Sequence, residues 1–305
     1  MRNEAGGRLV YLDFLRGIAA LMVIVIHVSR FVAPTPIPVE FTARGVQLFY
    51  VLSAYTLLLR NYDDSKTFLI KRFFRIAPLY YSAIIFYNWS HLFHWKTLLA
   101  FFFIDTRVVP FSWSISVEIL FYLMFPILAK KINSLTSAIA FTCITFISGT
   151  IVTLIFENTY FTDYWFTSQL PVFGLGFVLY HLSGVAVFPV VAVMIAIGLL
   201  LRDAAPSFAA ACLFVVLIWM LSNVKMPRWL GLLGLISYST YLTHAAVMPL
   251  VKQWSSNNYG LGLMLTVGGT IVVATITYHL IEKPGISLGR KVINQLRQPQ
   301  KVLEA

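Results

Sequence analysis

The stretch from Val10 to Val28 is apolar enough to enter a membrane, yet it contains three ionisable side chains, Asp13, Arg16 and His27. A charged residue at the centre of a membrane helix costs about 3 kcal/mol, so such residues usually mark a functional site. An imidazole can act as a general base or as a nucleophile. A guanidinium binds anions through charge-assisted hydrogen bonds. These three residues are therefore the first candidates for catalysis.

The spacing of these residues places them near one face of a helix. Arg16 and His27 are eleven positions apart, which is about three turns plus 20°, and Asp13 lies within about 60° of that face. At a rise of about 1.5 Å per residue, His27 lies about 16 Å beyond Arg16 along the axis. One face thus carries a cation and a titratable ring at two depths. The alternative is an Asp13–Arg16 pair that reaches the membrane surface, with His27 at the opposite interface.

Two other apolar segments also contain titratable side chains. Glu118 lies in Trp113–Leu128, and His244 ends the polar band SYSTYLTH within Leu230–Val251. With cytoplasmic termini, His27, Glu118 and His244 all fall in the middle or outer part of the bilayer, and we expect them to converge on one polar cavity. A structural role beside a buried Tyr or Arg fits Glu118 equally well. For His244 a hydrogen-bonded packing role is favoured.

Basic residues and histidines at the ends of the predicted spans are weaker indications of a functional site. Arg72 and Arg75 lie in KRFFR, at the cytoplasmic end of a predicted span. Paired guanidinium groups suit a phosphate-bearing ligand, although spacing alone slightly favours the ordinary basic residues that flank membrane helices. His91 and His94 have the i, i+3 spacing of a metal pair, but the sequence around them offers no further ligand. We therefore expect an exposed aromatic loop there and no metal site.

The composition is that of a membrane protein with many spans. Hydrophobic residues make up 59% of the 305 residues and charged residues 11%, against about 45–50% and 25% in soluble domains. The mean hydropathy is +0.79. We predict an all-α, polytopic bundle of about ten transmembrane helices. The predicted spans are approximately Val10–Val28, Gly45–Leu59, Ile76–Trp89, Trp113–Leu128, Ser137–Phe156, Trp165–Leu182, Val185–Leu201, Phe208–Leu221, Leu230–Val251 and Gly260–Ile281.

The distribution of basic residues predicts the orientation of the bundle. Sixteen Lys and Arg fall on the side of the termini and six on the other, with Arg16 left inside the membrane. The positive-inside rule then places both termini in the cytoplasm, and the net charge of +11 needs no nucleic-acid partner. Cys143 and Cys212 lie in apolar runs and indicate neither a disulfide nor a metal site. We expect one transmembrane domain over 1–290, a basic cytoplasmic tail over 291–305, and a first span that is retained rather than cleaved.

Six ordered motifs resemble a known family. YLDFLRGIAALMVIVIHVSR is similar to the first helix of the membrane-bound acyltransferase 3 family, of the O-antigen and nodulation-factor O-acetylase type. The chain departs from the family pattern at Ala54, usually Gly, at Ile119 and Leu120, usually polar, and at Thr243, often aromatic. These departures affect substrate details more than the chemistry. The further motifs, in the family's order, are GVQLFYVLSAY, FLIKRFFRIAPLYY, FSWSISVEILFYLMFPIL, LGLISYSTYLTH and HLIEKPGISLGR.

The resemblance implies an enzyme of the inner membrane that moves an acyl group, usually acetyl, from cytoplasmic acyl-coenzyme A to a hydroxyl of an extracytoplasmic or lipid-linked carbohydrate. His27 matches the family's essential histidine, Arg16 its arginine partner and Glu118 the motif glutamate. Arg72 and Arg75 match its paired arginines. The 1–290 region would then be the acyltransferase domain, in the short form without an appended extracytoplasmic domain.

Together these observations suggest a vertical arrangement. We expect Arg72, Arg75 and Arg16 to bind acetyl-coenzyme A, and His27 to act as general base on the acceptor or to carry the acyl group transiently. Asp13 or Glu118 would orient or tune this system. The substrate would contact the polar band of the ninth span, whose hydroxyls could also stabilise an oxyanion, through Ser237, Tyr238, Tyr241 and His244.

Two other functions fit the same composition. A transporter or flippase for a glycan or a lipid-linked sugar would also have many spans and buried charges, although the lack of a recognisable inverted repeat argues mildly against it. A non-catalytic scaffold for a polysaccharide synthase is the third possibility. The expected partners of the enzyme are a coenzyme A thioester, a carbohydrate acceptor and membrane lipids.

Overall fold

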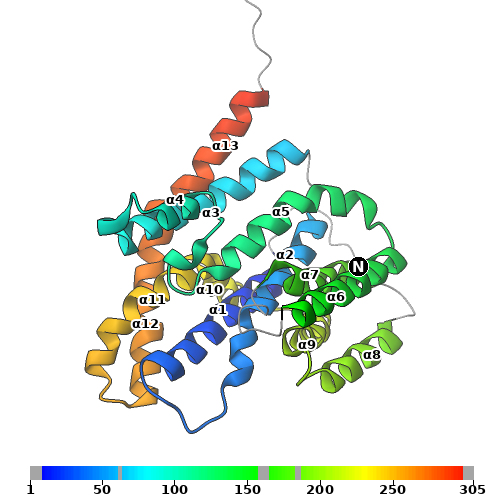
Figure 1. The fold of residues 1–305 in the computed structure, drawn as a ribbon, viewed down its shortest axis with the longest axis horizontal. Coiled ribbons are helices and arrows are strands. Elements are labelled where there is room, and N and C mark those ends of the chain that lie inside the picture. The colour runs from blue at the N-terminus through cyan, green and yellow to red at the C-terminus, as the bar shows by residue number, and fades with distance from the viewer. Residues whose placement is uncertain (1–8, 61–63, 157–164, 183–186, 298–305) are drawn as a thin grey trace, which may run out of the picture.

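A computed structural model describes residues 9–60, 64–156, 165–182 and 187–297. Over these ranges the regular structure consists of helices, without strands, which confirms the all-α prediction (Figure 1). The main helices are α1 (Val10–Phe31), α2 (Gly45–Leu59), α3 (Ser65–Tyr87), α4 (Trp95–Phe101), α5 (Trp113–Lys131), α6 (Leu135–Ile155), α7 (Phe166–His181), α8 (Val187–Leu200), α9 (Pro206–Leu221), α10 (Leu232–Leu235), α11 (Ser237–Trp254), α12 (Tyr259–Thr277) and α13 (Lys283–Arg297).

Helix α1 lies in the middle of the bundle and contacts α2, α10, α11 and α12. In Figure 1 it runs between the α11–α12 pair on one side and the group formed by α6, α7 and α9 on the other. Small residues allow this close packing: a Cβ added to Gly45, at the start of α2, would lie 2.6 Å from the carbonyl oxygen of Ala19. The first predicted span is therefore a helix, and it is a central packing element of the bundle.

Aromatic rings join α2, α5 and α7 within the same hydrophobic core. The ring of Phe173 on α7 stacks on Tyr50 of α2 at 4.5 Å and on Phe121 of α5 at 3.9 Å between centroids. All three side chains are fully buried. Stacked aromatic pairs contribute beyond their buried area, by about 0.5–1.5 kcal/mol each, and they fix α5 beside α2.

The chain bends sharply between α10 and α11. The segments Arg228–Leu235 and Ser237–Trp254 meet at an angle of 57°. Glycine allows α10 to press against α1, because a side chain at Gly234 would overlap the backbone of Asp13 and a Cβ at Gly17 would lie 2.8 Å from Leu233. The bend places the first residues of α11 in the interior of the bundle rather than at its surface.

Helix α3 is longer than the sequence predicted. The connector RNYDDSKTFLIKRFFR was expected to precede a span at Ile76, whereas α3 begins at Ser65 and ends at Tyr87. The carboxylate of Asp64 caps it by accepting a hydrogen bond of 2.8 Å from the backbone N–H of Thr67. Such an N-cap satisfies a donor that the first helical turn leaves unpaired. Arg72 and Arg75 consequently lie within a helix and not in a connector.

The C-terminal region is also helical beyond the last predicted span. A π-helical turn, Tyr278–Glu282, joins α12 to α13. Helix α13 packs on α3, where Gly285 approaches Pro78 and Gly289 approaches Phe74. The boundary predicted between residues 290 and 291 falls inside α13, and residues 298–305 of the predicted tail lie outside the described part.

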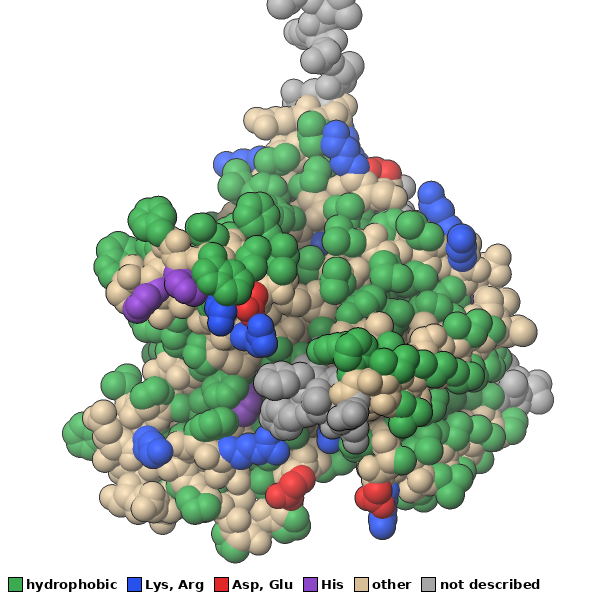
Figure 2. Space-filling view, viewed as in Figure 1, with side chains coloured by type: hydrophobic (Ala, Val, Ile, Leu, Met, Phe, Trp, Pro, Cys, Tyr) green, Lys and Arg blue, Asp and Glu red, His purple; other side chains and the backbone are tan. Residues whose placement is uncertain are grey.

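The outer surface is suited to lipid. Figure 2 shows hydrophobic side chains over most of the visible face, with charged groups in a few places. Helix α6 exposes a row of aliphatic side chains that includes Ile144, Ile147, Ile151 and Leu154. An apolar exterior around a helical bundle is what a bilayer requires. The chain is a multi-pass membrane protein.

Fewer than ten of the described helices qualify as membrane spans by length and hydropathy alone. Within the described ranges, four helices are long and apolar enough to cross a membrane, or five if the bent pair around Ile236 counts as one span. Each of the ten predicted segments nevertheless overlaps a helix, although Val185, the predicted start of the seventh, is not described. The count of ten and the cytoplasmic termini remain predictions.

Candidate active site

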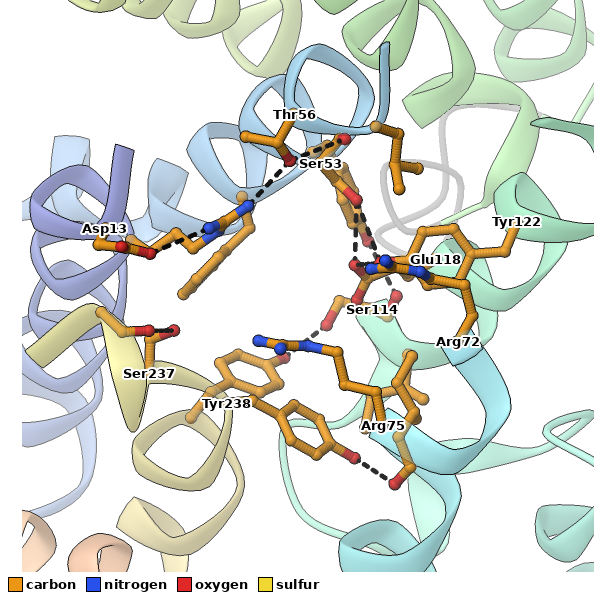
Figure 3. Close-up of a pocket in the computed structure, with 18 of the residues that line it drawn as sticks. Asp13, Ser53, Thr56, Arg72, Arg75, Ser114, Glu118, Tyr122, Ser237 and Tyr238 are labelled. Atoms are coloured by element: carbon orange, nitrogen blue, oxygen red, sulfur yellow. Dashed lines mark hydrogen bonds and ion pairs between the residues drawn. The ribbon is translucent and has the colours of Figure 1, made fainter. Parts of the chain in front are cut away.

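A cavity of about 320 Å³ lies among helices α1, α2, α3, α5 and α11. Figure 3 shows its polar side chains pointing inward from these helices. Eight of the ten predicted site residues line it. They are Asp13, Arg16, Arg72, Arg75, Glu118, Ser237, Tyr238 and Tyr241.

The cavity is rich in positive charge. Four arginines line it, Arg16, Arg60, Arg72 and Arg75, against two carboxylates, those of Asp13 and Glu118. With all six groups ionised, the lining carries an excess of two positive charges. A concave, partly buried site with one sign of charge concentrates ligands of the opposite sign. The cavity is therefore suited to an anion.

Arg16 is fixed by contacts with its own helix and with α2. Its Nη1 lies 3.2 Å from Oδ1 of Asp13, and its Nη2 donates a hydrogen bond of 2.8 Å to the hydroxyl of Thr56. The side chains of Arg16 and Asp13 are only 20% and 11% exposed. The intrahelical pair thus exists, but it forms part of the cavity wall.

Glu118 is held by hydroxyl groups from two helices. Its Oε1 accepts a hydrogen bond of 3.2 Å from Ser53 of α2 and a short one from Tyr122, one turn further along α5. The guanidinium of Arg72 lies over the Tyr122 ring, 5.7 Å from its centroid. Glu118 is thus a partner of a buried tyrosine and a lining residue of the cavity at once. Ser53 and Tyr122 were not predicted as site residues. Their positions inside the second and fourth family motifs are the sequence signal that could have identified them.

The two arginines of α3 keep donors available for a ligand. Arg72 Nε is buried without a hydrogen-bond partner. Among the described residues, Arg75 has no hydrogen bond or ion pair, and Figure 3 shows its side chain extending into the cavity. Guanidinium donors that the protein itself leaves unpaired are ready to bind phosphate.

Three hydroxyls of the SYSTY band that line the cavity are engaged with the backbone. Ser237 donates to the carbonyl of Gly234 at 3.0 Å, and Tyr238 donates to that of Ile76 at 2.9 Å. Tyr241 donates to the carbonyl of Phe111. A donor to an oxyanion needs a proton that is free to point at it, and these three hydroxyl protons point elsewhere in this conformation.

His27 and His244 meet one layer beyond the cavity. Nδ1 of His27 lies 2.8 Å from Nε2 of His244, so the predicted proximity of these two rings is confirmed. Neither is among the lining residues, and Glu118, expected to join them, lies instead in the cavity itself. The predicted convergence of all three on one cavity is therefore only partly found.

Tyr241 and Phe111 form the layer between the cavity and His27. Tyr241 lines the cavity and its hydroxyl bonds to the backbone of Phe111, whose ring stacks on His27 at 3.9 Å between centroids. Phe111 was not predicted, although it begins the motif FSWSISVE. It has a φ of 61°, a left-handed conformation that bulky residues rarely adopt.

The comparison with known families decides the identity. A family model described as an acyltransferase domain matches residues 9–280. The chain belongs to the acyltransferase 3 family. No curated protein and no solved structure matches it. This acyltransferase 3 protein is thus a membrane acyltransferase, and the first helix with Arg16 and His27 lies inside the matched region.

Proposed function

We propose that this acyltransferase moves an acetyl group from acetyl-coenzyme A to a hydroxyl of an extracytoplasmic or lipid-linked carbohydrate, in the inner membrane and in the manner of the O-antigen and nodulation-factor O-acetylases. The observation that carries the proposal is the cavity lined by four arginines, separated by a single layer of side chains from a hydrogen-bonded histidine pair. An anion site beside a histidine base suits a donor that carries phosphates at one end and a thioester at the other.

The donor fits the residues of the cavity. Arg75 offers a guanidinium without a hydrogen bond or ion pair in the described structure, and Arg72 an unpaired Nε donor, for the phosphates of coenzyme A. Helix α11 begins at the cavity with Ser237 and Tyr238, and the N-terminal end of a helix adds a partial positive charge. The volume of about 320 Å³ falls in the usual range for small-molecule sites, about 300–1,000 Å³. Arg16 would lie along the path from the phosphates towards His27.

The chemistry assigned to His27 is proton transfer. Its imidazole takes the proton of the acceptor hydroxyl while the hydroxyl oxygen attacks the thioester carbonyl. The carbon–sulfur bond then breaks, and the imidazolium returns its proton to the departing thiolate. General base catalysis of this kind contributes about 10²–10⁴-fold in rate. Transient acylation of His27 is the variant route to the same products.

From the cavity, the thioester would reach His27 past the Tyr241–Phe111 layer. The hydrogen bond from the Tyr241 hydroxyl to the Phe111 carbonyl closes this layer, and the Phe111 ring covers one face of the imidazole. We expect donor binding to displace the Phe111 ring, because its side-chain contacts are apolar packing and include the rings of His27, Phe31 and His244.

The test uses purified protein in detergent with acetyl-labelled coenzyme A and a polysaccharide fraction as acceptor. Wild-type protein should release free coenzyme A and label the polysaccharide, and His27→Ala should lower transfer by about 10²-fold or more. His279→Ala, which removes an exposed histidine, is the matched control. Near-normal transfer by His27→Ala would reject the role of His27, and glycan movement across proteoliposomes without label transfer would favour a transporter. Mass spectra of surface polysaccharide from cells with and without the gene would identify the acceptor.

A further inference from the structure

The two histidines form a chain of hydrogen bonds that ends on the backbone. His27 Nδ1 lies 2.8 Å from His244 Nε2, and His244 Nδ1 lies 2.6 Å from the carbonyl oxygen of Tyr241. His244 is fully buried, whereas His27 is partly exposed. The inner ring therefore has fixed partners on both nitrogens, and the outer ring has one nitrogen, Nε2, left for other contacts.

The orientation of the rings is that of a directed hydrogen bond. Their planes are parallel within 2° and their centroids are 5.0 Å apart. With the two nitrogens 2.8 Å apart, this places the rings edge to edge, unlike the face-to-face stack of His27 on Phe111 at 3.9 Å. In-plane approach aligns an N–H of one ring with the lone pair of the other, which is the favourable geometry.

The position of each proton follows from the end of the chain. A carbonyl oxygen can only accept, so Nδ1 of His244 carries a hydrogen. A neutral imidazole has one N–H, which leaves His244 Nε2 as an acceptor. A cationic His244 is disfavoured because its hydrogen-bond partners are a carbonyl and an imidazole, without a carboxylate, at a fully buried position. His27 Nδ1 must then be the donor, and His27 Nε2 keeps its lone pair.

We propose that His244 is a positioning residue that holds His27 in the tautomer with a free Nε2, so that Nε2 is the basic atom of the reaction. His244 thereby takes the place that a carboxylate has in a serine-protease triad, where it orients the imidazole and stabilises the imidazolium. When His27 gains a proton, its Nδ1–H becomes a charge-assisted donor to His244 Nε2, which strengthens the bond. The assignment rests on the proposed acyl transfer at His27.

The same contacts connect the pair to the cavity. The carbonyl that fixes His244 belongs to Tyr241, and the hydroxyl of Tyr241 bonds to the backbone of Phe111. Phe111 in turn packs on both imidazole rings, at 3.9 Å from His27 and 5.5 Å from His244. The residues that separate the cavity from the histidines thus also hold their orientation.

The test compares His244→Phe, which keeps a ring but has no acceptor, with His244→Gln, whose amide oxygen can accept from His27 Nδ1. Loss of the orienting aspartate in a serine protease lowers kcat about 10⁴-fold. Because His244 is a neutral partner, we expect His244→Phe to lower kcat by a smaller factor, about 10–10³-fold. KM for acetyl-coenzyme A should change little, since His244 does not line the cavity. His244→Gln should recover part of kcat. His279→Phe serves as the exposed control.

A second readout does not depend on turnover. Nitrogen-15 NMR of histidine-labelled protein distinguishes an Nδ1–H imidazole from an Nε2–H imidazole, and the signal of His27 among the six histidines is assigned by its loss in His27→Asn. Wild-type His27 should be the Nδ1–H tautomer, and His244→Phe should shift it towards Nε2–H. An Nε2–H signal in wild type, or an unchanged tautomer and kcat in His244→Phe, would overturn the assignment. The expected tautomer in a protein that transfers no acetyl group would leave the positioning intact and refute the proposed reaction instead.

Discussion

The left-handed backbone of Phe111 is the most unusual single-residue feature of the site. Strained conformations persist where the surroundings enforce them, at a cost of about 1–3 kcal/mol. Here the ring stacks on His27 and the carbonyl accepts the Tyr241 hydroxyl. Phe111 therefore both covers the imidazole and closes the cavity, which gives a direct test by removing its ring.

Phe111→Ala should connect the cavity to His27 and admit water beside the thioester. We expect acetyl-coenzyme A hydrolysis without acceptor to rise several-fold, while transfer to the acceptor falls. Free coenzyme A released in the absence of polysaccharide measures this. Phe103→Ala is the matched control, because Phe103 also has a φ of 61° but stacks on Tyr80 instead of His27. Equal hydrolysis of acetyl-coenzyme A by wild type and Phe111→Ala would show that the Tyr241–Phe111 layer does not separate the cavity from His27.

Arg75 gives the second residue-scale prediction. Its guanidinium enters the cavity without a protein partner in the described structure, so Arg75→Ala should weaken acetyl-coenzyme A binding. A hydrogen bond between charged groups contributes about 1.5–3 kcal/mol, which corresponds to roughly 10–150-fold in Kd. Isothermal titration with coenzyme A measures the change. Lys71→Ala, which removes an exposed charge from the same helix, is the control. If it weakened coenzyme A binding as much as Arg75→Ala, both residues would be ordinary basic residues that flank a membrane helix.

Sequence alone could predict which residues line the site but not what each one contacts. Eight of ten predicted residues share the cavity. Residue type inside apolar spans identified Asp13, Arg16 and Glu118, whereas the role of Arg72 and Arg75 was predicted from the family resemblance. The partners Thr56 of Arg16 and Ser53 of Glu118 lie 40 and 65 positions away along the chain. Contacts between helices depend on rotation and tilt, which the period of a single helix does not determine. For the same reason the separation of His27 from Glu118 could not be foreseen.

At the scale of elements, close packing of α10 on α1 positions the Asp13–Arg16 pair. A side chain at Gly234 would overlap the backbone of Asp13, and backbone atoms cannot move aside without shifting a helix. Gly234→Ala should therefore lower the thermal midpoint in detergent and reduce transfer. Gly268→Ala on α12 is the matched control, because a Cβ there meets nothing within 4 Å, and alanine favours a helix over glycine by about 1 kcal/mol.

If Gly234→Ala and Gly268→Ala had the same thermal midpoint, α10 could move away from α1 without loss of stability. The contact of Gly234 with Asp13 would then not hold the break before Ser237.

The bend of 57° between α10 and α11 was not predicted, because the sequence indicated one continuous span over Leu230–Val251. Apolar residues run through the break and no proline marks it, so hydropathy alone does not distinguish it from a continuous span. The early start of α3 was missed for a related reason, since charged side chains in Ser65–Arg75 suggested a connector although they belong to a helix.

At the scale of the whole molecule, the orientation in the membrane determines whether the proposed reaction is possible. Of the cavity arginines, Arg60 follows the last residue of α2, and Arg72 and Arg75 lie in the N-terminal half of α3, the half predicted to be nearer the cytoplasm. Coenzyme A thioesters are made in the cytoplasm, so a cavity that opened to the opposite side would have no donor. The positive-inside rule supports the cytoplasmic orientation with sixteen basic residues against six.

This orientation can be tested by labelling with a membrane-impermeant maleimide. In a background in which Cys143 and Cys212 are replaced by alanine, Lys96→Cys in the first turn of α4 should react in intact cells. Lys66→Cys at the start of α3 should react only after permeabilisation. Both lysines are exposed, so differences in burial do not explain a difference in labelling. The reverse pattern would place the arginine cavity outside the cytoplasm, and the acyl donor would then have to be an extracytoplasmic compound even if His27 and His244 act as proposed.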